Sequence, residues 1–116
     1  GSEILVPKIP SYRITDLAKS ITPSCKLNVI GIRPGEKIHE EMITESDSFT
    51  TFDIGDYYII LPNSNKKILN YYSKKFNLKK VKKGFRYNSG LNPTFLKIEQ
   101  IRKLIKKHVD KNFKPI

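Results

Sequence analysis

The residues best suited to chemistry stand together in residues 31–43, which read GIRPGEKIHEEMI. Arg33 carries a planar guanidinium that can form two parallel hydrogen bonds to a phosphate. Glu36, three residues later, carries a carboxylate that can accept hydrogen bonds from the vicinal hydroxyls of a sugar. Together they supply what a nucleotide requires, a cation for phosphate and a carboxylate for ribose. The competing interpretation is that Arg33 forms a surface ion pair with Glu36 or Glu40 and binds no ligand.

The flanking pattern predicts how these side chains are positioned. Residues 26–32 alternate apolar and polar types and end in β-branched residues, which predicts a strand. Pro34 suits the first turn of a helix, because its missing N–H group would be unpaired there. The helix is expected to bury Ile38, Met42 and Ile43. A strand, a tight turn and a helix in this order point backbone N–H groups at an anion.

The rest of the chain predicts an α+β fold of short strands with three or more helices. Strands are expected at residues 4–9, 49–52 and 57–61, with Pro7 confining the first to a sheet edge. A short helix is expected at 14–21, with Thr15 or Asp16 as its N-cap.

Three segments in the C-terminal half differ in how clearly they can be interpreted. The last helix is the clearest, because apolar residues from Ile98 to Val109 recur at helical spacing after Thr94, a residue suited to capping. Periodicity leaves residues 69–76 open between helix and strand, and residues 85–87 favour an extended segment.

Size and composition limit the classes of function. The 116 residues, 38% of them hydrophobic, suffice for one small domain. We expect Gly1 and Ser2 to be the remnant of an expression tag, and residues 3–116 to form a single domain. A lone cysteine, Cys25, fits a reducing compartment, and no apolar run is long enough to span a membrane. We therefore expect a cytoplasmic protein with no membrane partner, and no motif indicates a metal site.

The net charge of +11 raises a second class of function, a nucleic-acid-binding module. Lysines concentrate in the second half of the chain, where aromatic residues stand among them, a mixture that single strands favour. The aromatic residues concerned are Tyr71, Tyr72, Phe76, Phe85 and Tyr87. This alternative leaves residues 31–43 unexplained, so we expect nucleic acid not to be the partner and the lysines to form a solvated basic face.

Four segments in order carry a resemblance to a known family. They are EILVPKIPSYRITDLAKSI, VIGIRPGEKIHEEMITESDS, DYYIILP and FRYNSGLNPTFLKIEQIRKLI. They resemble the C-terminal region of bacterial nucleotide-sugar dehydratases, which are extended short-chain dehydrogenase/reductases of the polysaccharide biosynthesis protein family. Within these, the sequence is most similar to the inverting UDP-N-acetylglucosamine 4,6-dehydratases of the pseudaminic acid pathway.

The resemblance implies roles for particular residues. It implies that Arg33 holds the diphosphate of a UDP-sugar and that Glu36 holds the uridine ribose. Lys8 stands where relatives carry another phosphate-facing basic residue. Lys37, His39 and Glu40 are expected to support the pocket or the loop, and His39 distinguishes the inverting branch from relatives with tyrosine there.

The resemblance also implies what this chain leaves out. The family's glycine-rich dinucleotide loop, its acid/base residues and its Tyr-x-x-x-Lys pair lie in an N-terminal portion. We therefore expect no catalytic residue and no cofactor in this chain, with NADP bound by the missing dinucleotide-binding domain. The expected partners are a UDP-sugar, that missing domain and further copies of the parent enzyme. A free-standing accessory domain that self-associates through exposed apolar surface remains open.

Overall fold

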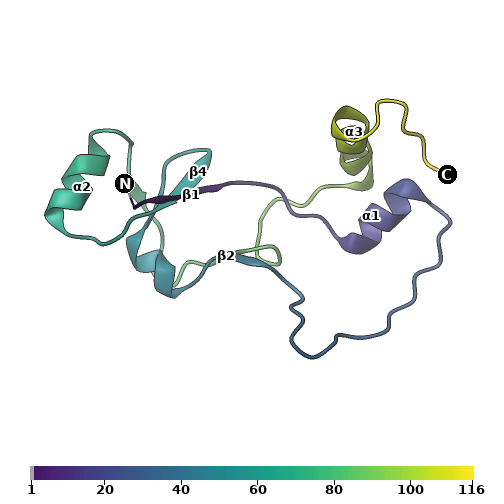
Figure 1. The fold of residues 1–116 in the computed structure, drawn as a ribbon, viewed down its shortest axis with the longest axis horizontal. Helices are drawn as coiled ribbons and strands as arrows, with labels where there is room; N and C mark the ends of the chain where they lie inside the picture. The colour runs from purple at the N-terminus through teal and green to yellow at the C-terminus, as the bar shows by residue number, and fades with distance from the viewer. Residues whose placement is uncertain (1) are drawn as a thin grey trace. The chain divides into compact units, whose positions relative to one another are not determined.

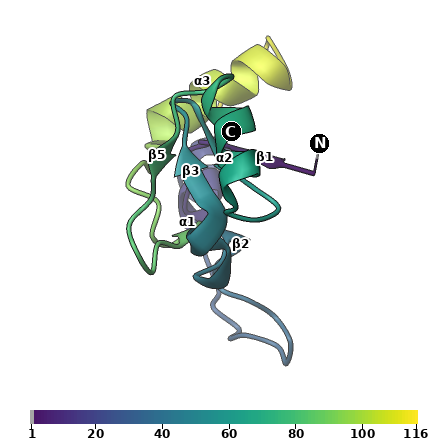
Figure 2. The ribbon, with the colours of Figure 1, turned by 90° about the vertical axis from the view of Figure 1, so that its left-hand side faces the viewer.

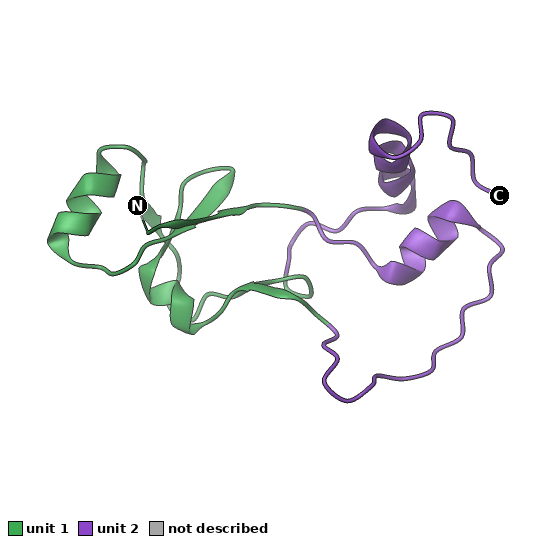
Figure 3. Ribbon diagram, viewed as in Figure 1, with its two compact units in different colours: residues 1–9, 39–91 green, residues 10–38, 92–116 purple. Residues whose placement is uncertain are grey.

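The computed structural model describes residues 2–116, and its contacts divide the chain into two compact units (Figure 3). Unit 1 comprises Gly1–Ile9 and His39–Leu91, and unit 2 comprises Pro10–Ile38 and Asn92–Ile116.

Unit 1 is built on a four-stranded antiparallel sheet (Figures 1 and 2). Its order is β1 (Ile4–Pro7), β4 (Tyr57–Ile60), β3 (Thr51–Asp53) and β5 (Lys79–Lys80). β1 therefore lies at an edge, as Pro7 predicted, because proline cannot donate a ladder hydrogen bond.

Two hydrophobic clusters hold unit 1 together. In the first, Phe52, Ile59, Leu61 and Tyr72 are buried, and α2 (Lys66–Ser73) contributes the tyrosine. The segment left open between helix and strand is thus partly helical. The α2 helix starts at an Asn65 cap, whose side chain accepts a hydrogen bond from the Ile68 N–H at 2.9 Å.

The second cluster buries Val6, Ile43 and Tyr87. Ile43 belongs to β2 (Glu41–Ile43), which pairs antiparallel with β6 (Tyr87–Asn88). Two residue steps on β2, from Glu41 to Ile43, oppose one step on β6, which is a β-bulge. A 3₁₀ helix, η1 (Ser46–Thr50), then leads from β2 to β3.

Unit 2 contains two helices that pack against each other, α1 (Ile14–Ile21) and α3 (Ile98–His108). The Arg102 guanidinium of α3 donates to the Ser20 carbonyl of α1 at 3.0 Å. The predicted bounds of α1 are confirmed, but its N-cap is Arg13 rather than Thr15 or Asp16. α3 begins after Lys97 rather than at the predicted Thr94 cap.

The elements predicted around residues 31–43 are wrong. Residues 26–32 form no strand, and no helix follows Pro34; residues 26–38 run as an open loop (Figure 1). Val29 and Ile30 are 91% and 79% exposed, so these apolar side chains are not buried as those of a paired strand in a core would be. Ile38 is also exposed, whereas Ile43 is buried by β2 rather than by a helix.

The fold class is confirmed as a small α+β protein with three α-helices and antiparallel strand pairs among residues 2–116. Of the segment predicted to be extended at residues 85–87, Tyr87 begins β6, and residues 85 and 86 lie outside any strand. Whether residues 3–116 act as one domain of a larger enzyme stays a prediction. No helix in the described part of the chain is long and apolar enough to cross a bilayer.

Candidate functional site

A tight turn presents the Arg33 and Glu36 side chains. The Glu36 N–H donates to the Arg33 carbonyl at 3.1 Å, which closes a four-residue turn around Pro34 and Gly35. Gly35 has φ +83°, a conformation that other residues rarely adopt. Proline at the second position and a positive-φ glycine at the third are typical of a type II turn. The predicted helix fails here because this turn reverses the chain instead.

The two side chains meet across this turn. Arg33 Nε lies 3.1 Å from Glu36 Oε1, and the Arg33 N–H donates to Glu36 Oε2 at 3.1 Å. The guanidinium-bearing side chain is 78% exposed and the carboxylate-bearing one 47%. The structure therefore contains the ion pair that the competing interpretation expected. Exposed pairs of this kind contribute about 0–1 kcal/mol, so a ligand phosphate can compete for the guanidinium.

Lys37 follows on the same loop and is exposed, but Lys8 is bound elsewhere, in unit 1. Lys8 Nζ lies 2.7 Å from Asp53 Oδ1 and 4.8 Å from the centre of the Tyr58 ring. Partial burial raises the pKa of Asp53, but hydrogen bonds from Lys8 and the Gly55 N–H outweigh it and lower that pKa below its ordinary value. A phosphate that bound Lys8 would have to displace Asp53.

His39 and Glu40 lie in unit 1, immediately before β2. The Glu40 N–H donates to Ser89 Oγ at 3.0 Å, and the Ser89 N–H donates to the Glu40 carbonyl at 2.9 Å. The His39 imidazole lies against Gly90. Both residues are thus fixed by the turn at 88–90, in keeping with the predicted loop-supporting role, which stays a prediction for ligand binding.

Sequence reasoning missed the importance of the 88–90 turn. The sequence predicts no role for Asn88, Ser89 and Gly90 beyond a turn, because Asn, Ser and Gly are common turn residues. The Asn88 side chain accepts from the N–H groups of Gly90 at 3.0 Å and Leu91 at 2.8 Å, an arrangement that asparagine favours. The Asn-Ser-Gly sequence is typical of a turn, but nothing in the sequence indicates that this turn holds Glu40.

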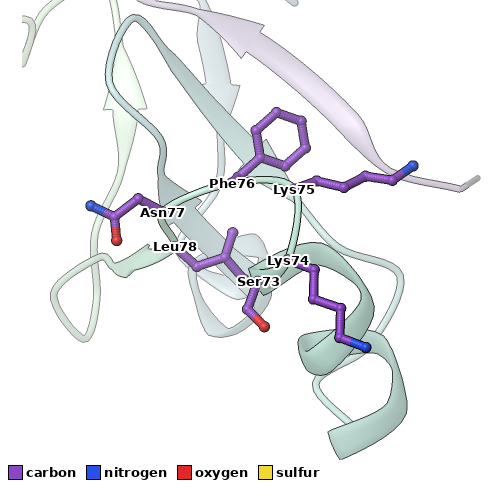
Figure 4. A pocket seen from close by; sticks show the side chains of 6 residues that line it. All are labelled: Ser73, Lys74, Lys75, Phe76, Asn77 and Leu78. Atoms are coloured by element: carbon purple, nitrogen blue, oxygen red, sulfur yellow. The ribbon is translucent and has the colours of Figure 1, made fainter.

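The structure also shows two pockets that include none of the predicted site residues. An open pocket of about 460 Å³ in unit 1 is lined by residues 73–78 (Figure 4). An apolar pocket of about 270 Å³ in unit 2 lies along α3. It is lined by Tyr12, Leu17, Leu96, Ile101, Leu104, Ile105, His108 and Val109.

Sequence reasoning overlooked one Tyr-x-x-x-Lys spacing, formed by Tyr71 and Lys75, whose lysine lines the first of these pockets. Lys75 Nζ donates to the Tyr71 hydroxyl at 2.7 Å and lies 4.5 Å from the centre of the same ring. This hydrogen bond is the main cause of a raised Lys75 pKa. Tyr71 is 52% exposed. The contact is thus a solvent-facing pair at the end of α2, and neither residue meets another predicted site residue in unit 1.

The structure also bears on the nucleic-acid alternative. Tyr72 and Tyr87 are buried, and Phe76 and Phe85 pack against the two hydrophobic clusters. Of the five aromatic rings in question only Tyr71 is exposed, and Lys75 covers its face. Base stacking needs exposed ring faces, so this arrangement argues against a single-strand binding surface. Among the described residues, no cluster of three metal-ligating side chains occurs.

Comparison with known proteins gives this geometry a context. A family model described as "Polysaccharide biosynthesis protein" matches residues 1–62, more than half of the chain and including the Arg33–Glu36 turn. The chain belongs to the polysaccharide biosynthesis protein family.

Relatives within this family are similar over most of the chain. It is 40% identical over 111 residues to the inverting UDP-N-acetylglucosamine 4,6-dehydratase of Campylobacter jejuni subsp. jejuni serotype O:2. It is 39% identical over 112 residues to the protein of that name from serotype O:23/36. Each alignment covers 90% of this chain but 33% of the relative, so the chain spans about a third of their length.

A solved structure shares the fold. The X-ray structure of Pen from Bacillus thuringiensis superposes with a TM-score of 0.67 at 26% identity, over 94% of this chain and 31% of that one. The family resemblance and the α+β fold that the sequence predicted are therefore confirmed. The relatives named above are enzymes of nucleotide-sugar chemistry.

Proposed function

We propose that this chain binds the UDP part of a UDP-sugar, with UDP-N-acetylglucosamine as the expected substrate. In this proposal it is the C-terminal part of an inverting, NADP-dependent 4,6-dehydratase. The parent enzyme would act in the cytoplasm in the synthesis of surface glycans such as those containing pseudaminic acid. It would work as a homo-oligomer, and the 116 residues alone would be inactive.

One observation carries the proposal. The Arg33–Glu36 turn displays a guanidinium and a carboxylate together on an exposed loop, in a chain 40% identical to an inverting UDP-N-acetylglucosamine 4,6-dehydratase. Guanidinium groups bind phosphates through paired hydrogen bonds, and carboxylates accept bonds from ribose hydroxyls. The type II turn keeps the two groups three residues apart while reversing the chain.

Binding would proceed by exchange of partners. The diphosphate replaces the Glu36 carboxylate at the Arg33 guanidinium, and the released carboxylate accepts hydrogen bonds from the ribose. The exposed ion pair costs little to break, whereas charge-assisted hydrogen bonds contribute about 1.5–3 kcal/mol each. Lys37, on the same loop, adds positive charge, and Lys8 would contribute only after leaving Asp53.

The residues of this chain do not fit NADP. The sequence lacks the Gly-x-Gly-x-x-Gly loop that holds a dinucleotide pyrophosphate. We assign NADP and the catalytic groups to the part of the parent enzyme outside these residues. In this proposal, the chain binds the nucleotide end of the substrate.

The test is a titration of the 116-residue protein with UDP and with inorganic pyrophosphate, followed by NMR chemical shifts. Arg33→Ala should weaken both ligands by roughly tenfold or more, because each loses a charge-assisted hydrogen bond. Glu36→Gln should weaken UDP but not pyrophosphate, because only UDP has a ribose. Glu99→Gln is the matched control, since Glu99 also pairs with an arginine three residues away.

Two results would contradict the proposal. Equal UDP-induced shifts in wild type and Arg33→Ala would remove the assignment of Arg33. Conversion of UDP-N-acetylglucosamine by the purified 116-residue protein would show that the catalytic groups are not confined to the missing part.

A further inference from the structure

We propose that His39 and Gly90 are positioning residues that fix the point at which the chain leaves the Arg33–Glu36 turn and enters β2. The inference rests on the proposed function, since the position of the turn matters only if the turn binds a ligand. Neither residue would contact the nucleotide in this proposal.

The His39 imidazole occupies the space that a side chain at position 90 would take, so Gly90 matters here for space rather than for backbone conformation. A Cβ atom at Gly90 would lie 2.6 Å from Cδ2, 2.7 Å from Nε2 and 2.8 Å from Cε1 of His39. Carbon atoms do not approach this closely, so any side chain at position 90 must displace the imidazole. The glycines with positive φ differ, because a Cβ there would meet nothing closer than 3.7 Å: they are Gly31, Gly35, Gly55 and Gly84.

The surface beneath the imidazole is itself fixed. Asn88 Oδ1 accepts hydrogen bonds from the N–H groups of Gly90 and Leu91, which sets the shape of the turn. Ser89 exchanges two hydrogen bonds with Glu40, the residue after His39. One residue further, Glu41 Oε1 accepts from Arg86 Nε at 2.9 Å. His39 therefore begins a run of three consecutive residues held by residues 86–90.

The segment before His39 has no such support. Within residues 2–116, Lys37 and Ile38 take part in no hydrogen bond, and the Ile38 side chain is 77% exposed. Among the described residues His39 makes no hydrogen bond either, but its imidazole lies against Gly90, so it is the first residue after Glu36 in contact with residues 86–90. The two positions are three residue steps apart, a span of at most about 11 Å in extended chain. Loss of the anchor at His39 would lengthen the free connection to the turn.

The first experiment needs no ligand. Backbone order of Lys37 and Ile38 is measured by ¹⁵N relaxation in wild type, Gly90→Ala, His39→Ala and the double variant, with His108→Ala as control. Both single variants should lower the order at these two residues and leave β3 and β4 unchanged. The double variant should match His39→Ala, because the added methyl has no imidazole to displace.

The second experiment adds UDP to the same proteins. Both single variants should bind UDP roughly threefold to tenfold more weakly than wild type, without additivity in the double variant. His108→Ala should bind as wild type does. Gly90→Ala should still fold, because the exposed imidazole can move aside.

The outcomes separate this inference from the proposed function. If wild type binds UDP and both single variants bind equally well, the proposed function stands and the positioning role is overturned. If wild type does not bind UDP, the proposed function fails, and the ligand-free order of Lys37 and Ile38 alone decides whether His39 and Gly90 position the segment. Unchanged order in Gly90→Ala, or effects that add in the double variant, would overturn the inference in either case.

Discussion

The two units of this chain differ in how they use their apolar residues. Seven of the eight buried hydrophobic side chains among residues 2–116 belong to unit 1, and Ile101 alone belongs to unit 2. Unit 2 instead exposes apolar side chains along its open loop, as at Val29, Ile30 and Ile38. The stability of the described structure therefore resides mainly in unit 1, while the turn with the candidate ligand groups lies in the less supported unit.

The largest difference should appear on truncation of one isoleucine in each unit. Ile43→Ala removes a side chain with no exposed surface, which should cost about 2–5 kcal/mol of unfolding free energy through lost burial and a cavity. Ile30→Ala, in the loop, should change it by less than about 0.5 kcal/mol. Urea denaturation measures both. Similar losses would mean that the loop is packed in solution.

A smaller contrast is expected at two turn glycines. Gly55, with φ +108°, closes the turn between β3 and β4, and Gly35, with φ +83°, closes the Arg33–Glu36 turn. Alanine at Gly55 should lower the unfolding free energy by about 1–2 kcal/mol, because the left-handed conformation becomes strained within the sheet.

The same change at Gly35 should leave global stability within about 0.5 kcal/mol, because the loop turn can open without unfolding the rest. NMR shifts should nevertheless show that the turn is lost. A large stability loss from Gly35→Ala would contradict the division into a supporting and an exposed region.

The smallest effect concerns acid. The lowered pKa of Asp53 means that its ionised form stabilises the folded state above its ordinary pKa of 3.8. That contribution is lost as pH falls through the lowered, folded-state pKa. Asp53→Asn should therefore be less stable than wild type near neutral pH, and the difference should shrink as the pH falls below the ordinary pKa of Asp53.

Thermal denaturation as a function of pH measures this convergence. Asp56→Asn is the matched control in the same turn. The Lys8 backbone N–H donates to the Asp56 backbone carbonyl at 3.0 Å, so this bond does not depend on the Asp56 side chain. A gap between wild type and Asp53→Asn that stays constant with pH would show that Asp53 acts through packing rather than charge.

Local patterns sufficed where an element's neighbours were themselves local or strongly apolar. The spacing of Ile14, Leu17 and Ile21 predicted α1 to the residue, because one helical face repeats every three to four positions. Pro7 predicted an edge strand, and Tyr57–Ile60, rich in aromatic and β-branched residues, became β4 at the middle of the sheet. The family resemblance likewise followed from the linear order of motifs.

The same patterns failed at the candidate site. Residues 26–32 have the alternation of a strand, but a strand needs a neighbouring strand to satisfy its backbone, and none is provided within unit 2. Glu36–Ile43 have helical spacing, yet the pairing of Glu41 and Ile43 with β6 makes an extended ladder instead. After the Arg33–Glu36 turn, long-range pairing overrode local helical propensity, whereas before it the lack of a pairing partner left residues 26–32 as loop.

The sequence by itself determined the family, the α+β class, helices α1 and α3, strands β1 and β4, and the residue types that can bind a nucleotide. The tertiary structure decided how those residues are held: Arg33 against Glu36, Lys8 against Asp53, and His39 against Gly90. The physical reason is sequence distance. Local propensities act over a few residues, whereas Lys8 and Asp53 stand 45 positions apart, and only the folded chain brings such groups together.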